Sequence, residues 1–254
     1  MPYMRDVGDL EKNRDYYLRT RFPNLNFLFE KRFNWMNDYI GETDEVLEVG
    51  CGVGVTKLFV NRGNVTLSDV VAHPWVDRQE DALKLSYADE SIDVLIANNM
   101  THHLAQPLKF FQEAYRVLKK GGRILIQEVN CSFLLQRLLR FMHIEDFNFN
   151  VDVFDINNIC TNPQNPWDGN NAIPNLLFDD VCKFEKSVPY FKVVEQKYSE
   201  CFIYIFSGGI SGKTFTIPLP YPALNIIDGI DNILVSTLPM VFALQRRVVL
   251  EKNK

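Results

Sequence analysis

The feature that most constrains the fold of this chain is a buried strand that runs directly into a glycine-rich turn. Residues 45–49 are mostly apolar, and Gly50, Gly52 and Gly54 follow in a Gly-x-Gly-x-Gly spacing. Glycine is needed where a Cβ would forbid a tight turn or would occupy the space of a ligand. In open α/β sheets the turn after a strand lies at the carboxyl edge, where ligands bind. The sequence therefore predicts a ligand-binding loop at residues 50–54.

Strands and helices alternate beyond this loop. Further strands are expected at residues 65–68, 92–97 and 123–129, helices at 55–61 and 107–118, and a turn at Gly121–Gly122. Such alternation is typical of an α/β fold, in which helices cover both faces of a mostly parallel sheet.

The flanking regions are less regular. We expect helix over residues 9–40 with an interruption at Pro23, helices at 132–143 and 224–234, extended chain at 191–206 and a last strand at 241–250. Nothing resembles a linker, so a single domain over residues 1–254 is predicted. It comprises N-terminal helices (1–44), the half that carries the glycine loop (45–129), and insertions at 130–190 and 207–239.

Charge and composition exclude several classes of protein. The chain has 27 Lys+Arg against 32 Asp+Glu, whereas binding to nucleic acid normally requires excess positive charge. The first residues lack the apolar core of a signal peptide, and the most apolar late stretch, 223–244, contains Asp228 and Asp231, so no membrane span is expected. Five scattered cysteines without a CxxC pair predict neither disulfides nor a zinc site, and favour a reducing cytoplasm. A group of arginines could form an anion-binding rim or a solvated helix face: Arg5, Arg14, Arg19 and Arg21.

The glycine spacing differs from the dinucleotide fingerprint, because G-x-G-x-x-G starting at Gly50 would need glycine where Val55 stands. With Glu48 at the strand end, the pattern instead resembles the S-adenosyl-L-methionine (SAM) binding loop of class I methyltransferases, of the methyltransferase type 11 kind. The resemblance continues through residues 45–129. Residues 81–87 are similar to D-A-x-x-L-P-F with Ser86 in place of proline, 91–95 to S-F-D-V-V, 102–104 to L-H-H-L, and 113–122 to E-x-x-R-V-L-K-P-G-G. It implies a Rossmann-like, doubly wound sheet of seven strands, mostly parallel, with helical and loop insertions as a cap.

The resemblance also implies the cofactor, SAM, and its product, S-adenosyl-L-homocysteine. It places Asp69 at the ribose hydroxyls, Asp81 at the adenine, and Asn98 at the methionine moiety or the substrate. The expected cofactor-binding residues are Glu48, Gly50, Cys51, Gly52, Gly54, Asp69, Val70, Asp81, Ala82 and Asn98. As alternatives, Asp69 could be a solvated turn residue and Asp81 could cap its own turn. Cys51 is interpreted as a small turn residue, because nothing near it in sequence would lower its pKa.

His102 and His103 are the candidate catalytic residues. A histidine beside the transferred methyl group could take a proton from a hydroxyl nucleophile, because its pKa lies near neutrality. Alternatively, one of them fills the edge of the sheet. No metal site is expected: Asn98 and Asn130 stand where metal-assisted relatives carry acidic ligands, although Glu128 is acidic.

The candidate substrate residues are Trp167, Asn170, Asn171 and Tyr204. The first three lie in a long polar loop of the kind that lines ligand clefts. The N/D-P-P-Y/F motif of enzymes that methylate nucleic-acid amino groups is missing at residues 98–101. We therefore expect a SAM-dependent methyltransferase for a small polar acceptor, such as a sugar or another O-nucleophile. A nicotinamide enzyme and a non-catalytic binding module are the alternatives. The sequence leaves open the acceptor, the methylated atom and the oligomeric state.

Overall fold

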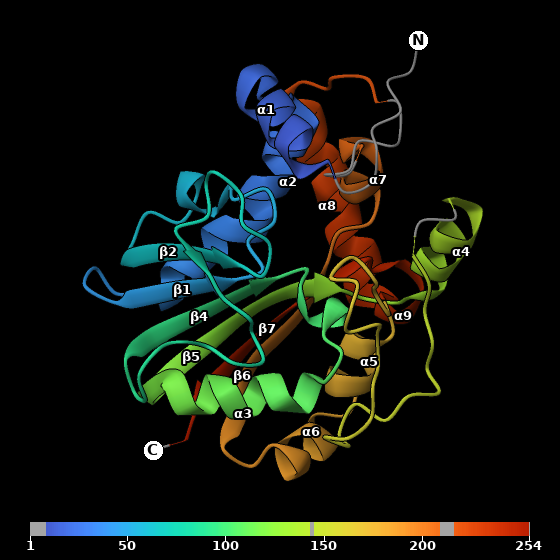
Figure 1. Ribbon diagram of the computed structural model, residues 1–254. Helices are drawn as coiled ribbons and strands as arrows, with labels where there is room; N and C mark the ends of the chain where they lie inside the picture. The colour runs from blue at the N-terminus through green and yellow to red at the C-terminus, as the bar shows by residue number, and fades with distance from the viewer. Residues whose placement is uncertain (1–8, 143–144, 209–215, 254) are drawn as a thin grey trace.

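The computed structural model describes residues 9–142, 145–208 and 216–253, and its centre is a twisted seven-stranded sheet with helices on both faces (Figure 1). The strand order is β3-β2-β1-β4-β5-β7-β6. Strands β1 to β5 pair in parallel, whereas β7 is antiparallel to its neighbours β5 and β6. The strands are β1 (Glu45–Val49), β2 (Asn64–Asp69), β3 (Arg78–Gln79), β4 (Ile92–Asn98), β5 (Leu118–Val129), β6 (Phe191–Ser199) and β7 (Gln245–Lys252). The predicted Rossmann-like, mostly parallel seven-stranded sheet is confirmed.

The helices are α1 (Leu10–Thr20), α2 (Pro23–Phe33), α3 (Pro107–Val117), α4 (Phe133–Met142), α5 (Ile173–Phe178), α6 (Val181–Ser187), α7 (Phe202–Ser207), α8 (Tyr221–Thr237) and α9 (Pro239–Phe242). Short 3₁₀ turns are η1 (Asn34–Tyr39), η2 (Thr56–Leu58) and η3 (Thr101–His103). Pro23 opens α2, where its missing N–H costs no hydrogen bond, so the predicted interruption is correct. Among the described helices, none has the length and apolar character needed to cross a bilayer.

Alternate residues of the central strands feed two separate cores. Leu47 and Leu95 face the side on which Phe111 of α3 packs, together with α5 and α6. Val46 and Val94 face the opposite side, which α2 covers with Leu28. Figure 1 shows the same division, with α3, α5 and α6 on one face and α1, α2, α7 and α8 towards the other. Because both faces are buried, the central strands are apolar on both sides, as parallel sheets require.

One part of the sequence-based assignment is wrong near the carboxyl end of the insertion region. Residues 191–206 were expected to be extended, but the strand stops at Ser199 and α7 is helical. The first backbone N–H groups of α7, those of Cys201, Phe202 and Ile203, donate to the buried carboxylate of Asp231 in α8. This N-cap comes from a distant residue and leaves no local signal.

Three smaller differences have local causes. The helix expected at 55–61 is reduced to η2, because the chain must return to the parallel strand that begins at Asn64. The expected turn at Gly121–Gly122 is an irregularity inside β5, where the pairing partner jumps from Leu118 to Arg123. The last strand starts at Gln245 because residues 239–242 form α9.

Candidate functional site

The glycine loop follows β1 and has left-handed backbone at each glycine. The φ angles are +68° at Gly50, +49° at Gly52 and +59° at Gly54. A Cβ on Gly50 would lie 2.4 Å from Met100 Cγ, and one on Gly54 would lie 2.2 Å from Trp75 Cδ1. At Gly52 a Cβ would meet no atom within 4 Å. Two of the glycines therefore make room for neighbouring side chains, whereas Gly52 borders open space.

Asp69 ties the end of β2 to this loop. Its carboxylate accepts hydrogen bonds from the backbone N–H groups of Gly52 (2.9 Å) and Val71 (3.0 Å). Asp69 is mostly buried, yet it still faces a cavity. The two backbone bonds use only part of the four lone-pair sites of a carboxylate. The group can therefore accept further hydrogen bonds from a ligand.

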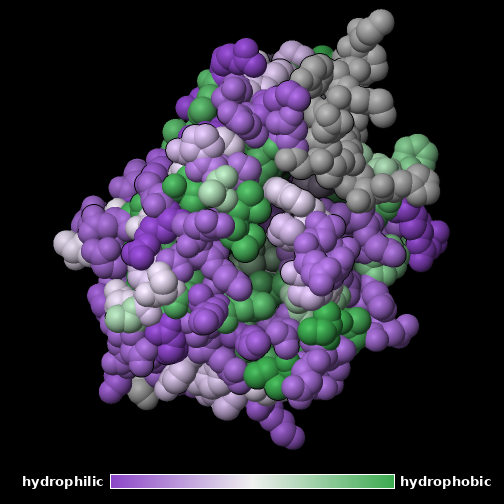
Figure 2. All heavy atoms as spheres, viewed as in Figure 1, coloured by the Kyte–Doolittle hydropathy of each residue, from purple (hydrophilic) through white to green (hydrophobic). Residues whose placement is uncertain are grey.

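The cavity in front of the loop has a volume of about 310 Å³, within the range of small-molecule sites. Of the predicted cofactor residues, those that line it are Gly50, Asp69, Val70, Asp81 and Ala82. The opposite wall contains Met100, His103, Leu104 and Trp167. Figure 2 shows hydrophobic side chains bordering a hollow near the middle of this face, beside the carboxyl ends of β1 and β4 in the same view of Figure 1.

Glu48 is buried beneath the loop and does not itself line the cavity. Its Oε1 accepts a hydrogen bond from the Thr56 hydroxyl (2.8 Å), whereas its Oε2 has no partner in the described structure. Burial raises the pKa of Glu48 to about 8. A buried acceptor without a donor is unfavourable, and is a common feature of sites that receive a ligand.

The remaining predicted cofactor residues have mixed positions. Asp81 caps its own turn by accepting from Leu83 N–H (2.8 Å), and it also lines the cavity. Cys51 is buried, which raises the pKa of its thiol above the usual range. Asn98 lies beside the cavity with its Oδ1 accepting from Asn99, and it is Asn99, with a left-handed φ of +48°, that lines the wall.

Sequence reasoning missed two residues that hold the loop in place. Arg14 of α1 donates from one Nη1 to the carbonyls of Val53 (2.5 Å) and Gly54 (2.7 Å). Its guanidinium lies over the Trp75 ring, 5.0 Å from the centroid, and Trp75 Nε1 donates to the Gly52 carbonyl (2.9 Å). Arg14 was grouped with an anion-binding rim or a solvated face, and Arg5 of that group falls outside the described residues. No local pattern connects Arg14 with a loop so far along the chain.

His102 lies behind the cavity in a pair with Glu128, the penultimate residue of β5. Its Nδ1 is 2.5 Å from Glu128 Oε1, and both groups are buried. Burial by itself would lower the pKa of His102, but the charge of Glu128 outweighs it and the pKa is raised. Burial likewise opposes ionisation of Glu128, but His102 and the hydrogen bonds from Thr101 bring its pKa down to about 2.

His103 faces the cavity. Its Nδ1 lies 3.1 Å from the carbonyl of Asp168, and its ring centroid is 4.1 Å from that of His102. Burial and the positive charge of His102 lower the pKa of His103 to about 4. His103 is therefore neutral at neutral pH, with Nδ1–H donating to the carbonyl and a lone pair on Nε2.

The predicted substrate residues separate into different roles. Trp167 is 43% exposed and lines the cavity opposite Asp69. Asn170 is buried, and its amide bonds within the loop to Asn148 and Ala172. Asn171 is also buried and donates to Glu145 Oε2 (3.0 Å). Tyr204 lies on α7 below the Arg32 guanidinium, 5.4 Å from it, and lines neither this cavity nor the neighbouring hollow.

A second hollow of about 550 Å³ lies on the other side of the Trp167 loop. Its lining includes Arg140, Glu145, Phe147, Trp167 and Asp168. Trp167 is shared by both spaces, so the loop that carries it forms a partition between them.

Comparison with known proteins agrees with this geometry. Residues 47–126 match the family model of a methyltransferase domain. An uncharacterized methyltransferase of Schizosaccharomyces pombe is 25% identical over 122 residues, an alignment that covers 38% of this chain and 44% of that protein. The chain thus matches less than half the length of this curated relative.

Solved structures share the fold. A SAM-dependent methyltransferase from Archaeoglobus fulgidus superposes with a TM-score of 0.54 at 16% identity, covering 94% of this chain and 98% of that one. A chain from the complex of the Haloferax volcanii Trm112 methyltransferase activator with its partner gives 0.50 at 14% identity, covering 98% and 97%.

The fold is shared with a SAM-dependent methyltransferase structure, and residues 47–126 match a methyltransferase-domain model, so this part of the chain resembles a class I, SAM-dependent methyltransferase domain. SAM is the cofactor that this family and fold imply. The residues that line the cavity fit it on two observations: the Asp69 carboxylate keeps lone pairs for ligand hydroxyls, and Gly50 and Asp81 border the same space.

Proposed function

We propose that this protein transfers the methyl group of SAM to a hydroxyl of a small polar acceptor, such as a sugar or another O-nucleophile. The observation that carries the proposal is the cavity itself. Its one wall holds Gly50 of the glycine loop with Asp69 and Asp81, and its other wall holds His103 and Trp167. The first wall suits a charged nucleoside. The second wall suits a polar acceptor that must be held next to that nucleoside.

The first wall, the cofactor side, comprises residues 48–54, 69–70, 81–82 and Asn98. In the proposal, Asp69 holds the ribose hydroxyls and Asp81 with Ala82 meets the adenine. Asn98 lies beside the methionine moiety, Glu48 supports the loop from beneath without lining the cavity, and Cys51 contributes backbone only. Gly52 leaves the space that the cofactor needs.

The cofactor supplies a methyl group already activated by its sulfonium. In the proposed transfer the acceptor oxygen would take the methyl group, the electron pair of the S–CH₃ bond would stay on the sulfur of the product, and the hydroxyl proton would pass to bulk water. The residues of this chain mainly have to align the acceptor, and alignment can contribute roughly 7–11 kcal/mol of barrier reduction.

The second wall, the acceptor side, comprises His102, His103, Glu145 and residues 162–171. His103 is neutral at neutral pH and can accept a hydrogen bond from an acceptor hydroxyl at Nε2. His102 is a poorer proton acceptor, because the charge of Glu128 favours its protonated form. Trp167 offers an exposed aromatic face of the kind that packs against sugar rings.

Two measurements test the proposal. Calorimetric titration with S-adenosyl-L-homocysteine should show binding, and titration with NAD should show none. A screen of sugars, other small alcohols and amines with isotope-labelled SAM, read by mass, should then label a hydroxyl compound. Binding of NAD alone would indicate a nicotinamide enzyme. Binding of S-adenosyl-L-homocysteine without any labelled acceptor would favour a non-catalytic module.

A further inference from the structure

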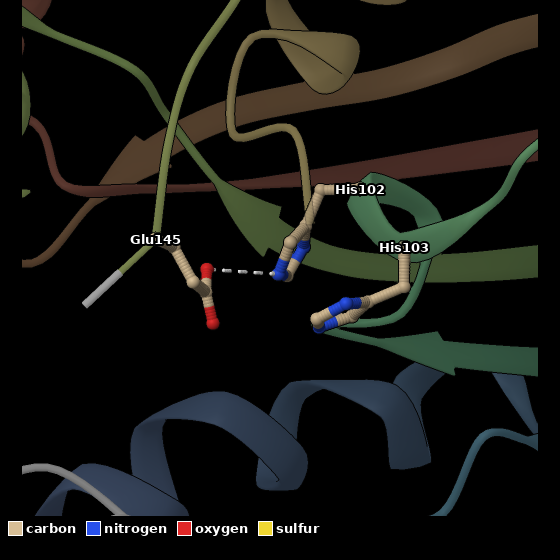
Figure 3. Close-up of side chains that lie close together, drawn as sticks. All are labelled: His102, His103 and Glu145. Carbon is tan, nitrogen blue, oxygen red and sulfur yellow. Dashed lines mark ion pairs between the residues drawn. The ribbon is translucent and has the colours of Figure 1, made fainter. Parts of the chain in front are cut away.

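Three side chains with metal-binding atoms come together on the acceptor side. His102, His103 and Glu145 each place one such atom within 4.8 Å of those of the other two, and His102 Nε2 lies 3.7 Å from Glu145 Oε2. Figure 3 shows the carboxylate of Glu145 directed at His102, with the ring of His103 beside it. Glu145 arrives from a loop far from the histidines in sequence, so no sequence spacing announces the cluster.

Each of the three residues is held from behind by a further group. His102 Nδ1 contacts the carboxylate of Glu128, and His103 Nδ1 contacts the backbone carbonyl of Asp168. Glu145 Oε2 accepts a hydrogen bond from the buried amide of Asn171. Metal-binding histidines are oriented in this way: an acceptor at one ring nitrogen fixes the tautomer and leaves the other nitrogen for the ion.

We infer that His102 Nε2, His103 Nε2 and the Glu145 carboxylate bind a transition-metal dication of the Zn²⁺ type. Two imidazole nitrogens and one carboxylate form a ligand set of catalytic zinc sites, which keep a further position open. Hard cations such as Mg²⁺ prefer sites made of oxygen. A four-coordinate ion with bonds of about 2.1 Å brings its ligand atoms to about 3.4 Å from one another. His102 Nε2 and Glu145 Oε2, at 3.7 Å, are already near this spacing, and the three ligand atoms all lie within 4.8 Å of one another.

The position of the site gives it a role, and this part of the inference rests on the proposed function. His103 lines the cofactor cavity, whereas Glu145 lines the second hollow across the Trp167 partition. An acceptor seated in the second hollow would reach the ion and the cofactor cavity together. With His103 Nε2 bound to the ion, the ion and not His103 would orient the acceptor hydroxyl and lower its pKa, and the proton would pass to bulk water.

The competing explanation is a plain ion pair, in which a protonated His102 lies between Glu128 and Glu145. In that case Glu145 would only pair with His102 and would not bind a metal ion, and His103 would have no role in the cluster. The contact of His103 Nδ1 with the Asp168 carbonyl, and the position of His103 within 4.8 Å of the other two side chains, are not needed for the ion pair but are needed for a ligand.

The test uses the full-length protein after treatment with a chelator. Calorimetric titration with Zn²⁺ should show one site per chain, Co²⁺ should give visible absorption bands of a nitrogen–oxygen site, and Mg²⁺ should not compete. Glu145→Gln and His103→Asn should each weaken Zn²⁺ binding by about 100-fold or more. Asn171→Ala, which removes the amide that donates to Glu145 Oε2 and to the Asp146 carbonyl, should weaken it by about 10–100-fold.

Matched controls change the same residue types outside the cluster. Asp146→Asn alters the exposed neighbouring carboxylate, and His73→Asn removes an imidazole that stacks on Trp75. Both should bind Zn²⁺ like the wild type. Circular dichroism establishes that every variant is folded.

Zn²⁺ binding that is equal in the wild type and in folded Glu145→Gln and His103→Asn would overturn the inference, as would no binding by the wild type. Titration with S-adenosyl-L-homocysteine in parallel separates this result from the proposed function. Binding of S-adenosyl-L-homocysteine without binding of Zn²⁺ would contradict only the metal site. Binding of Zn²⁺ without binding of S-adenosyl-L-homocysteine would contradict only the proposed methyltransferase function.

Discussion

The two walls of the cavity are built in different ways. The cofactor side uses backbone shape: three left-handed glycines, a strand end and two short turns, all within one stretch of the chain. The acceptor side uses side chains from separate elements, with His103 on η3, Glu128 on β5, Glu145 before the polar loop and Trp167 within it. A site made of local backbone can be recognised from sequence, whereas a site made of distant side chains cannot. The comparison also predicts that mutations on one wall leave the other wall's ligand nearly unaffected.

The largest effect is expected from Gly52→Val. A Cβ at this position meets no atom within 4 Å, so no neighbour has to move, but a β-branched residue at a φ of +49° also strains the loop, and both effects should disturb the cofactor's place. We expect affinity for S-adenosyl-L-homocysteine to fall by at least about 1,000-fold, or about 4 kcal/mol. Gly121→Val is the control, because Gly121 also has positive φ (+74°) and open surroundings but lies in β5 away from the cavity. Unchanged affinity in a folded Gly52→Val protein would remove the glycine loop from the site.

The second prediction concerns pH and Glu48. Its folded pKa of about 8 is above the ordinary value of 4.5, so the folded protein keeps a proton that the unfolded chain releases. The stabilisation from this group is complete below about pH 4.5 and is lost as the pH rises to about 8. At about 1.4 kcal/mol per pKa unit, the wild type should lose roughly 2–4 kcal/mol relative to Glu48→Gln over this range. Urea unfolding of both ligand-free proteins at several pH values measures the difference, and parallel curves would show an ordinary carboxyl.

Asp69→Ala should have the next largest effect on the cofactor side. It removes the acceptor of two backbone N–H groups and the proposed partner of the ribose hydroxyls. Charge-assisted hydrogen bonds contribute roughly 1.5–3 kcal/mol, so SAM affinity should fall by about ten-fold or more. A 2′-deoxy analogue should lose less affinity on the variant than on the wild type. Equal losses in the two backgrounds would exclude the ribose contact and leave Asp69 with the loop alone.

Arg14→Ala tests whether the loop needs support from α1. The variant loses the hydrogen bonds to the Val53 and Gly54 carbonyls, which share one donor nitrogen and together contribute about 1 kcal/mol, so cofactor affinity should fall by about five-fold. Arg19→Ala removes an exposed arginine of the same helix and should have no effect. If the two variants bind the cofactor equally well, Arg14 does not position the loop.

The smallest effect on the cofactor is expected from the acceptor side. Trp167→Ala removes the exposed ring that faces both hollows, so the acceptor should show a raised KM or a reduced kcat, with SAM binding nearly unchanged. Trp167 alone is a cleaner target than a double change with Asn170, whose amide holds the loop. Loss of SAM binding and acceptor turnover together would show that the two walls are not independent.

The folding of the carboxyl-terminal half shows why some elements could not be predicted. The region around 45–129 follows its own pattern, and β1, β4 and α3 begin where the alternation of apolar residues and Pro107 predict. In contrast, residues 202–207 turn helical because Asp231 supplies three hydrogen bonds from α8. An apolar run of six residues has no intrinsic preference strong enough to resist such a cap.

The sequence by itself determined the parallel sheet, the glycine loop and the positions of Asp69 and Asp81, because periodicity and turn chemistry act between residues that are close in the chain. Only the tertiary structure decided that Arg14 supports the loop, that Asn99 lines the wall beside Asn98, and that Asn170 is structural. It also decided which residues surround the histidines: Glu128 behind His102, and Glu145 in front of both. The physical reason is that side chains from distant segments meet only after the sheet has formed, so their chemistry depends on packing that no local pattern records.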